Sequence, residues 1–260
     1  MKVVILCGGQ GTRIREVSEV LPKPMIPIGR FPILWHIMKS YAAWGHTDFI
    51  LCLGYKGEVI REFFLNYDAL TRDTTITLGG KGNVEFHDAD SNWNWRVTLA
   101  ETGLESLTGT RIRLVRKYLA EDDNFMLTYG DGVANINLNN LVEFHESHGK
   151  ILTITGVHPP GRFGELKVTG SGLVTEFNEK SQLARGWISG GFLVANMKFF
   201  DYLGADEDLM FEEEPIRKLV RDRQVMMYQH DGFWHPMDTP RDYRHLNRLW
   251  EDDQAPWKIW

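Results

Sequence analysis

The chain opens with a short apolar run that ends in a cluster of glycines, and this junction constrains the fold more than any other stretch. Residues 3–7 read V-V-I-L-C, and Gly8, Gly9 and Gly11 follow within four positions. Such a run is typical of a buried strand that leaves a sheet at its carboxyl end, where open α/β sheets bind their ligands. We therefore expect an α/β fold with a ligand site after the first strand.

The loop after this strand has the composition of a phosphate-binding loop. Its glycines leave backbone N–H groups open to a phosphate, and Arg13 and Lys23 add positive charge. The spacing matches neither G-x-G-x-x-G nor G-x-x-x-x-G-K-[ST], which disfavours a dinucleotide oxidoreductase and a P-loop NTPase. A tight turn that needs glycine only for its backbone is the alternative, and the added Thr12-Arg13 and Lys23-Pro24 favour the phosphate site.

Composition narrows the partners and the compartment. The chain of 260 residues carries 29 Lys and Arg against 35 Asp and Glu, so it lacks the basic excess of a nucleic-acid binder. No apolar segment approaches a membrane span, and Met1 leads into the first strand without a leader pattern. Cys7 and Cys52 each stand in an apolar run, which favours buried reduced thiols. We expect one domain over 1–260, cytoplasmic, with no nucleic-acid or membrane partner.

Apolar spacing predicts strands alternating with helices in the first half of the chain. Helices are expected at 31–44, 58–66 and 107–119, and strands at 48–53, 97–101 and 124–129, the pattern of a parallel sheet. In the second half, strands are expected at 151–157, 165–168, 173–177, 187–195 and 225–229, with helices at 137–148, 197–203, 211–222 and, capped by Thr239, 240–250. The crowded strands of the second half predict a mixed or antiparallel arrangement.

Residues 67–96 interrupt this pattern with a polar insertion that contains Trp93 and Trp95. An insertion of this length is typically functional or interfacial. Exposed tryptophans would favour a self-association surface. A hairpin that folds its own tryptophans inward is the alternative, and both interpretations stay open.

Two aspartates stand where a carboxylate would reach the end of a sheet. Asp131 lies between Gly130 and Gly132 after the run of 124–129, and Asp238 follows the apolar-aromatic run of 232–237. Phosphoryl transfer needs cations on the phosphates and a metal ion at the reacting group, and Mg²⁺ prefers carboxylate oxygens. Taken alone, a glycine-flanked aspartate is also a common turn residue.

The glycine loop belongs to a wider pattern. L-x-G-G-x-G-T-R at 6–13 followed by K-P at 23–24 resembles the signature of the sugar-phosphate nucleotidyltransferases, which join a sugar 1-phosphate to a nucleoside triphosphate. Further motifs along the whole chain are similar to those of the glucose-1-phosphate cytidylyltransferases: P-I-L-W-H-I-M-K at 32–39, G-Y-K-G at 54–57, T-Y-G-D-G-V-A at 128–134, P-P-G-R-F-G at 159–164, G-F-W-H-P-M-D-T at 232–239 and A-P-W-K at 255–258.

This resemblance implies a Rossmann-like fold of the GT-A type. Its central sheet would be mixed but mostly parallel and flanked by helices, with a small antiparallel C-terminal region. Residues from about 1–135 would bind the nucleotide and residues from about 136–260 the sugar. The family also forms hexamers, so a homo-oligomer is implied, with 67–96 as a possible contact.

The resemblance further implies that CTP and α-D-glucose 1-phosphate react by in-line attack to give CDP-glucose and pyrophosphate, with Mg²⁺ as cofactor. Lys23, Arg13 and Asp131 are expected to be catalytic, and Asp131 and Asp238 to bind the metal ion. The expected nucleotide-binding residues are Leu6, Gly8, Gly9, Gly11, Thr12, Arg13, Lys23, Thr108, Gly109, Arg111 and Gly130. The expected sugar-phosphate-binding residues are Gly164, Glu179, Lys180, Ser189 and Gly190.

Two departures from the family pattern leave the sugar less determined than the reaction. The chain has Lys180-Ser181 where the family has K-P, and Ser189 where the family commonly has asparagine. A serine offers one hydroxyl in place of an amide donor and acceptor. Glu179-Lys180 read alone is an ordinary solvated pair. The alternatives are the same chemistry with UTP, dTTP or another sugar 1-phosphate, or a non-catalytic regulatory relative that binds nucleotide sugars.

Overall fold

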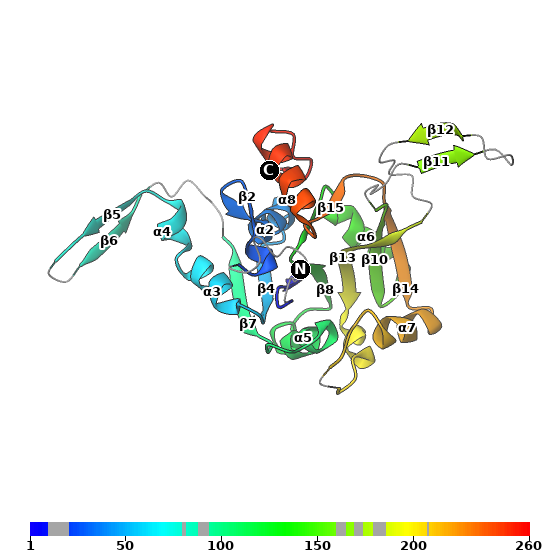
Figure 1. The fold of residues 1–260 in the computed structure, drawn as a ribbon. Coiled ribbons are helices and arrows are strands. Elements are labelled where there is room, and N and C mark those ends of the chain that lie inside the picture. Colours follow the sequence, from blue (N-terminus) through cyan, green and yellow to red (C-terminus); the bar gives the residue numbers. More distant parts are fainter. Residues whose placement is uncertain are drawn as a thin grey trace.

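The structure is a computed structural model that describes residues 1–9, 21–79, 82–87, 94–159, 165–168, 174–178, 186–206 and 208–260, with only the backbone described at 165–168 and 174–178. A seven-stranded sheet forms its centre (Figure 1). In spatial order the strands are β14 (Val225–His230), β10 (Leu152–Val157), β13 (Ile188–Asn196), β8 (Asn124–Tyr129), β1 (Val3–Leu6), β4 (Asp48–Leu53) and β7 (Arg96–Glu101).

The sheet is mixed and mostly parallel, as predicted. Strands β8, β1, β4 and β7 run parallel to one another, and β10 runs parallel to β14. Strand β13 is antiparallel to both of its neighbours, β8 and β10. The antiparallel character therefore begins inside the central sheet, where β13 joins the two parallel groups.

Helices cover both faces of the sheet. Helices α2 (Ile33–Ala43), α3 (Gly57–Leu65), α6 (Leu138–His148) and α8 (Pro240–Glu251) contribute to one buried cluster. Helices α5 (Thr108–Val115) and α7 (Glu214–Arg221), with the 3₁₀ helix η3 (Met197–Tyr202), contribute to the other. Successive residues of β1 alternate between the two clusters, Val3 and Ile5 in the first and Val4 and Leu6 in the second. This double burial explains the continuous apolar run.

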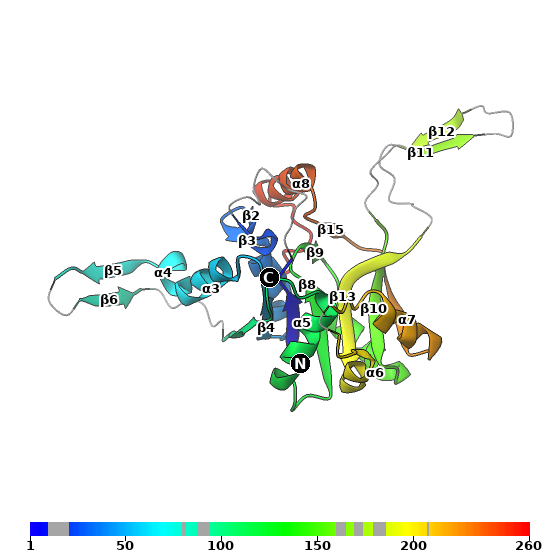
Figure 2. The ribbon, with the colours of Figure 1, turned by 60° about the horizontal axis from the view of Figure 1, so that its bottom comes forward.

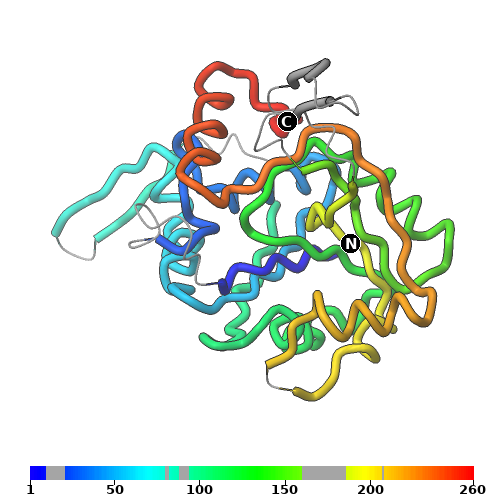
Figure 3. The backbone as a smooth tube through the Cα atoms, turned by 45° about the vertical axis from the view of Figure 1, so that its right-hand side comes forward, coloured from blue at the N-terminus to red at the C-terminus, as the bar shows by residue number. Residues whose placement is uncertain are grey.

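In the part of the chain that the structure describes, four small two-stranded sheets lie outside the central one. They pair β2 (Pro27–Ile28) with β3 (Phe31–Pro32), β5 (Thr74–Thr77) with β6 (Asn83–Phe86), β9 (Gly132–Ala134) with β15 (Trp234–Pro236), and β11 (Glu165–Val168) with β12 (Val174–Asn178). Helix α8 lies against the segment of β2 and β3 (Figure 3). In the loop between these strands, the Gly29 N–H donates a hydrogen bond to Asn247 Oδ1 at 2.9 Å. The carboxyl-terminal helix therefore packs on the amino-terminal segment that carries Lys23.

Some element boundaries differ from the sequence prediction. The helix expected at 31–44 begins at Ile33, because Phe31 and Pro32 pair with β2. Residues 197–202 form a 3₁₀ helix, and the helix expected from 211 begins at Glu214. The remaining short helices are η1 (Lys23–Met25), α4 (Tyr67–Thr71) and η2 (Arg116–Tyr118). Among the described residues, no helix combines the length and hydropathy needed to span a bilayer.

The insertion at 67–96 forms α4 and the hairpin of β5 and β6, which extends away from the central sheet in two views (Figures 1 and 2). Trp95 does not lie exposed: its ring packs edge-on against the ring of buried Phe49, with centroids 5.5 Å apart. Trp93 lies outside the described residues. The exposed apolar side chains of the hairpin are instead Ile76, Leu78, Val84 and Phe86.

Candidate active site

The glycine loop and Asp131 lie side by side because β1 and β8 are parallel neighbours. Leu6 is opposite Tyr129 in the register, and the Gly130 N–H donates to the Leu6 carbonyl at 3.0 Å. A Cβ atom on Gly130 would lie 3.0 Å from Pro24 Cγ and 3.1 Å from the Leu6 carbonyl oxygen. Glycine at this position therefore allows the loops after two adjacent strands to approach closely.

A short ladder brings Asp238 to Asp131. Strands β9 and β15 pair antiparallel, with Pro236 opposite Gly132, and the Met237 N–H donates to the Asp131 carbonyl at 2.8 Å. Met237 is fully buried, which fixes the backbone between the ladder and Asp238. The two aspartates, far apart in the sequence, are thus brought together by a backbone hydrogen bond between Asp131 and Met237, the residue before Asp238.

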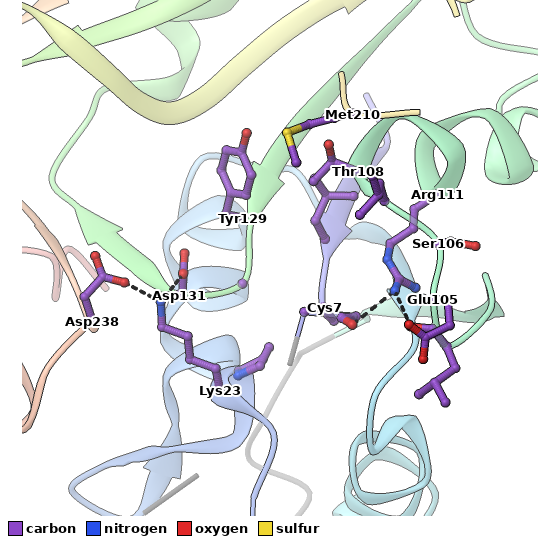
Figure 4. A pocket seen from close by; sticks show the side chains of 17 residues that line it. Cys7, Lys23, Glu105, Ser106, Thr108, Arg111, Tyr129, Asp131, Met210 and Asp238 are labelled. Carbon is purple, nitrogen blue, oxygen red and sulfur yellow. Dashed lines mark hydrogen bonds and ion pairs between the residues drawn. The ribbon is translucent and has the colours of Figure 1, made fainter. Parts of the chain in front are cut away.

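Lys23 stands between the two carboxylates. Its ammonium nitrogen lies 2.5 Å from Oδ2 of Asp131 and 2.6 Å from Oδ1 of Asp238 (Figure 4). Burial lowers the pKa of Lys23, but the two aspartates outweigh it and leave that pKa above its ordinary value. The pair of aspartates therefore already shares one cation in this structure.

A helix cap that follows Asp238 in the chain holds its backbone in place. Oδ2 of Asp242 accepts hydrogen bonds from the N–H groups of Asp238 at 3.1 Å and Thr239 at 2.8 Å. The Thr239 hydroxyl in turn accepts from the Asp242 N–H, completing a capping box at the start of α8. The predicted cap at Thr239 is confirmed, and it also fixes the position of Asp238.

A pocket of about 430 Å³ opens above these groups (Figure 4). Its lining includes the expected site residues Leu6, Gly8, Gly9, Lys23, Thr108, Arg111, Gly130, Asp131 and Asp238. No atom of the described residues lies within 4 Å of a Cβ built on Gly9, so the backbone there is not covered by any of them. The pocket is therefore lined partly by glycine backbone and partly by charged groups, which lie on both of its sides (Figure 4).

Arg111 forms part of the pocket wall but is only 4% exposed. Its guanidinium donates to the carbonyls of Leu53, Gly103, Gly8 and Leu104, and to the Thr102 hydroxyl. Burial is the main reason why its pKa is lowered. In this structure the guanidinium therefore ties together the loops that follow β1, β4 and β7.

Backbone N–H groups in the first turn of α5 are also hydrogen-bonded within the chain. The N–H groups of Gly109 and Thr110 donate to the Leu209 carbonyl at 2.8 and 3.2 Å. A Cβ on Gly109 would lie 2.7 Å from Leu209 Cγ, so glycine admits the neighbouring segment. The N–H of Gly109, an expected nucleotide-binding residue, is thus occupied, whereas the Thr108 side chain reaches the pocket.

A second, smaller pocket of about 70 Å³ adjoins the first and shares Tyr129 and Asp131 with it. It is lined by Ser189 and Gly190, two of the expected sugar-phosphate residues. The Trp234 indole N–H donates to the Gly190 carbonyl at 2.7 Å. The other expected residues, Gly11, Thr12, Arg13, Gly164, Glu179 and Lys180, lie outside the described residues.

The sequence analysis did not single out several residues of this region. Tyr129, Met210 and the stretch 104–107 line the larger pocket, and Trp234 lines the smaller one. Tyr129 lies within the motif at 128–134 and Trp234 within the motif at 232–239. Membership in these motifs is the only feature of the sequence that indicates a role for either residue in the site. Glu212, which hydrogen-bonds Tyr129 and Thr108, lies in an acidic run that reads as an ordinary solvated surface.

Comparison with known proteins agrees with this arrangement. Residues 2–253 match the family model described as nucleotidyl transferase, and the chain therefore belongs to the nucleotidyl transferase family. It is 45% identical over 260 residues to a glucose-1-phosphate cytidylyltransferase of Salmonella typhimurium, and 44% identical over 261 residues to a probable glucose-1-phosphate cytidylyltransferase of Bacillus subtilis, with all of each chain covered. The resemblance noted in the sequence is confirmed.

The fold is also shared with a solved structure, the crystal structure of HddC from Yersinia pseudotuberculosis. The match has a TM-score of 0.67 at 24% identity and covers 96% of this chain and 99% of that one. This likeness concerns the fold alone.

Proposed function

We propose that the chain transfers CMP from CTP to α-D-glucose 1-phosphate, giving CDP-glucose and pyrophosphate. The end-to-end identity with cytidylyltransferases supports the choice of substrates. The observation that carries the chemistry is the Lys23 ammonium held between Asp131 and Asp238 at the edge of the glycine-lined pocket. Such a cluster provides the charge that a polyphosphate reaction needs.

In the proposed reaction an oxygen of the sugar phosphate attacks the α-phosphorus of CTP. The bond from that phosphorus to the oxygen shared with the β-phosphate breaks, and pyrophosphate leaves with that oxygen. A phosphate monoester loses its second proton at a pH of about 6, so the nucleophile is ionised without a general base. Lys23 neutralises charge that builds up on the reacting phosphate, Gly8 and Gly9 offer their backbone to the triphosphate, and Arg13 counters the leaving pyrophosphate.

The two aspartates suit a Mg²⁺ ion. Their oxygens already converge on one cationic group, Mg²⁺ prefers oxygen ligands, and it commonly takes only one or two carboxylates beside substrate phosphates. Asp131 and Asp238 would hold the ion, which supplies charge neutralisation on the polyphosphate when bound. Lys23 and the backbone of the glycine loop would hold the nucleotide beside it.

The smaller pocket is the proposed sugar side of the site. Ser189, Gly190 and Trp234 line it next to Asp131, and Gly164, Glu179 and Lys180 are proposed to complete it. A Cβ on Gly190 would lie 2.6 Å from Val157 Cγ1, so no side chain fits there. Because Ser189 carries one short hydroxyl, a different hexose 1-phosphate is the second candidate substrate.

A substrate matrix tests the proposal. The purified chain would be incubated with each of five nucleoside triphosphates and several hexose 1-phosphates, with Mg²⁺ or with EDTA, and the products read by mass. The expected result is CDP-glucose, formed with Mg²⁺ only. If a product forms with UTP or dTTP but not with CTP, that nucleotide is the substrate instead of CTP. If no pair gives a nucleotide sugar, the result favours the regulatory, non-catalytic alternative.

We propose in addition that the chain is cytoplasmic and assembles with copies of itself, as a hexamer. The buried free thiols Cys7 and Cys52 support a reducing compartment, and burial raises the pKa of Cys52 to about 12.

Exposed Ile76 and Leu78 on the projecting hairpin support a self-association surface. Light scattering of the wild type and of Leu78→Ser tests the assembly, and a wild-type monomer at micromolar concentration would refute it.

A further inference from the structure

Tyr129 stands between the two pockets. It ends β8, and its side chain lines both the larger pocket and the smaller one. Gly191, at a φ of +78°, packs against it, since a Cβ there would lie 2.6 Å from Tyr129 Cδ2. The ring is therefore a shared wall whose position affects both cavities.

The carboxylate of Glu212 connects this wall to the other side of the larger pocket. One of its oxygens accepts a hydrogen bond from the Tyr129 hydroxyl. The other accepts from the hydroxyl of Thr108, the first residue of α5, at 2.5 Å. One side chain thus holds two hydroxyl groups of the pocket lining.

The segment that carries Glu212 is anchored on α5. The Phe211 N–H donates to the Thr108 hydroxyl oxygen at 3.1 Å, and the Leu209 carbonyl accepts from the N–H groups of Gly109 and Thr110. The Phe211 ring is 1% exposed and packs against Phe199. The exposed Glu212 carboxylate is therefore carried by a segment that Leu209 and Phe211 anchor.

We infer that Glu212 is a positioning residue that sets the wall between the nucleotide and sugar pockets, so that one carboxylate controls the binding of both substrates. The inference rests on the proposed function. Removing the bridge releases Tyr129 and Thr108 together, and both substrates then meet a less ordered wall. The loss is expected in both KM values rather than in the chemical step.

Steady-state kinetics of Glu212→Gln and Glu212→Asp test this inference. The first variant keeps the length of the side chain and the second keeps its charge. Each is expected to raise the KM of CTP and of glucose 1-phosphate by about fivefold, with kcat within about twofold and the melting temperature unchanged. Glu213→Gln is the control, because the neighbouring carboxylate makes no hydrogen bond to another described side chain.

A background lacking both hydroxyls, Tyr129→Phe with Thr108→Val, separates positioning from direct contact. In this background Glu212→Gln is expected to have no further effect on either KM. The inference is overturned if the wild-type enzyme turns over CTP and Glu212→Gln leaves the KM of CTP, the KM of glucose 1-phosphate or both of them unchanged. It is also overturned if the effect persists in the double background. Wild-type enzyme without turnover would refute the proposed function itself, before any variant is compared.

Discussion

The guanidinium of Arg111 occupies the space where a Cβ of Gly8 would lie. The substitution Gly8→Ala therefore tests how this part of the loop is held. A Cβ on Gly8 would lie 2.2 Å from Arg111 Cζ and 2.3 Å from Nη1, far inside the 3.0 Å that real Cβ contacts respect. The guanidinium has little room to retreat, because it is buried and hydrogen-bonded to four carbonyls and one hydroxyl.

The cost of Gly8→Ala follows from these hydrogen bonds. Displacing the guanidinium breaks about two of them and leaves their acceptors buried, at about 1–3 kcal/mol each, so the expected loss in the free energy of unfolding is about 3 kcal/mol. For a chain of this size that lowers the melting temperature by about 6–12 °C. Gly9→Ala is the control, since a Cβ there meets no atom of the described part of the chain within 4 Å and should leave the melting temperature nearly unchanged.

Thermal unfolding followed by calorimetry measures this difference. The same pair of substitutions is then made in an Arg111→Met background, where the clash with the guanidinium no longer exists and Gly8→Ala is expected to be nearly neutral. The reasoning is refuted if Gly8→Ala unfolds within about 1 °C of Gly9→Ala, or if its cost survives the loss of Arg111.

Three further predictions concern pH, the helix cap and the metal ligands. Burial lowers the pKa of His36 to about 4, so its contribution to stability is complete above about pH 6.5 and falls by about 3 kcal/mol toward pH 4. Between these pH values, urea unfolding should show a loss of stability larger by this amount in the wild type than in His36→Gln, which keeps the slopes of His46 and His145; equal slopes would contradict the prediction. Thr239→Val removes the hydroxyl that accepts from Asp242 and should cost about 1 kcal/mol in thermal unfolding; an unchanged melting temperature would contradict the cap. Asp131→Asn should weaken Mn²⁺ binding, read by electron paramagnetic resonance, by about tenfold or more, and unchanged binding would remove it as a ligand.

Local patterns were enough to predict the elements that deliver the site. The apolar run after Lys2 is confirmed as β1, and Asp131 follows β8 as expected because a strand end and its glycines are encoded by neighbouring residues. The cap at Thr239 was predictable for the same reason. The meeting of Asp131 and Asp238 was a hypothesis from resemblance, and the β9–β15 ladder provides its physical cause.

Contacts between distant segments left no such signal. The burial of Arg111 depends on Gly8 and Gly54, which follow different strands, and no local pattern pairs an arginine with two remote glycines. Glu212 reads as part of a solvated acidic run because the buried Phe211 beside it acts only through tertiary packing. The sequence left the exposure of Trp95 open because its partner Phe49 lies on β4, far from it in the chain.

The central claim is that the Lys23 ammonium between Asp131 and Asp238 is the cationic centre of nucleotidyl transfer. The most direct measurement is the kcat for pyrophosphate release from CTP and glucose 1-phosphate by Lys23→Met. Lys2→Met, which removes an ion pair with Asp122 outside the pocket, is the control. The account predicts a kcat about 10²- to 10³-fold below that of the wild type for Lys23→Met alone, in a protein that remains folded. A folded Lys23→Met enzyme with near-normal kcat would contradict it.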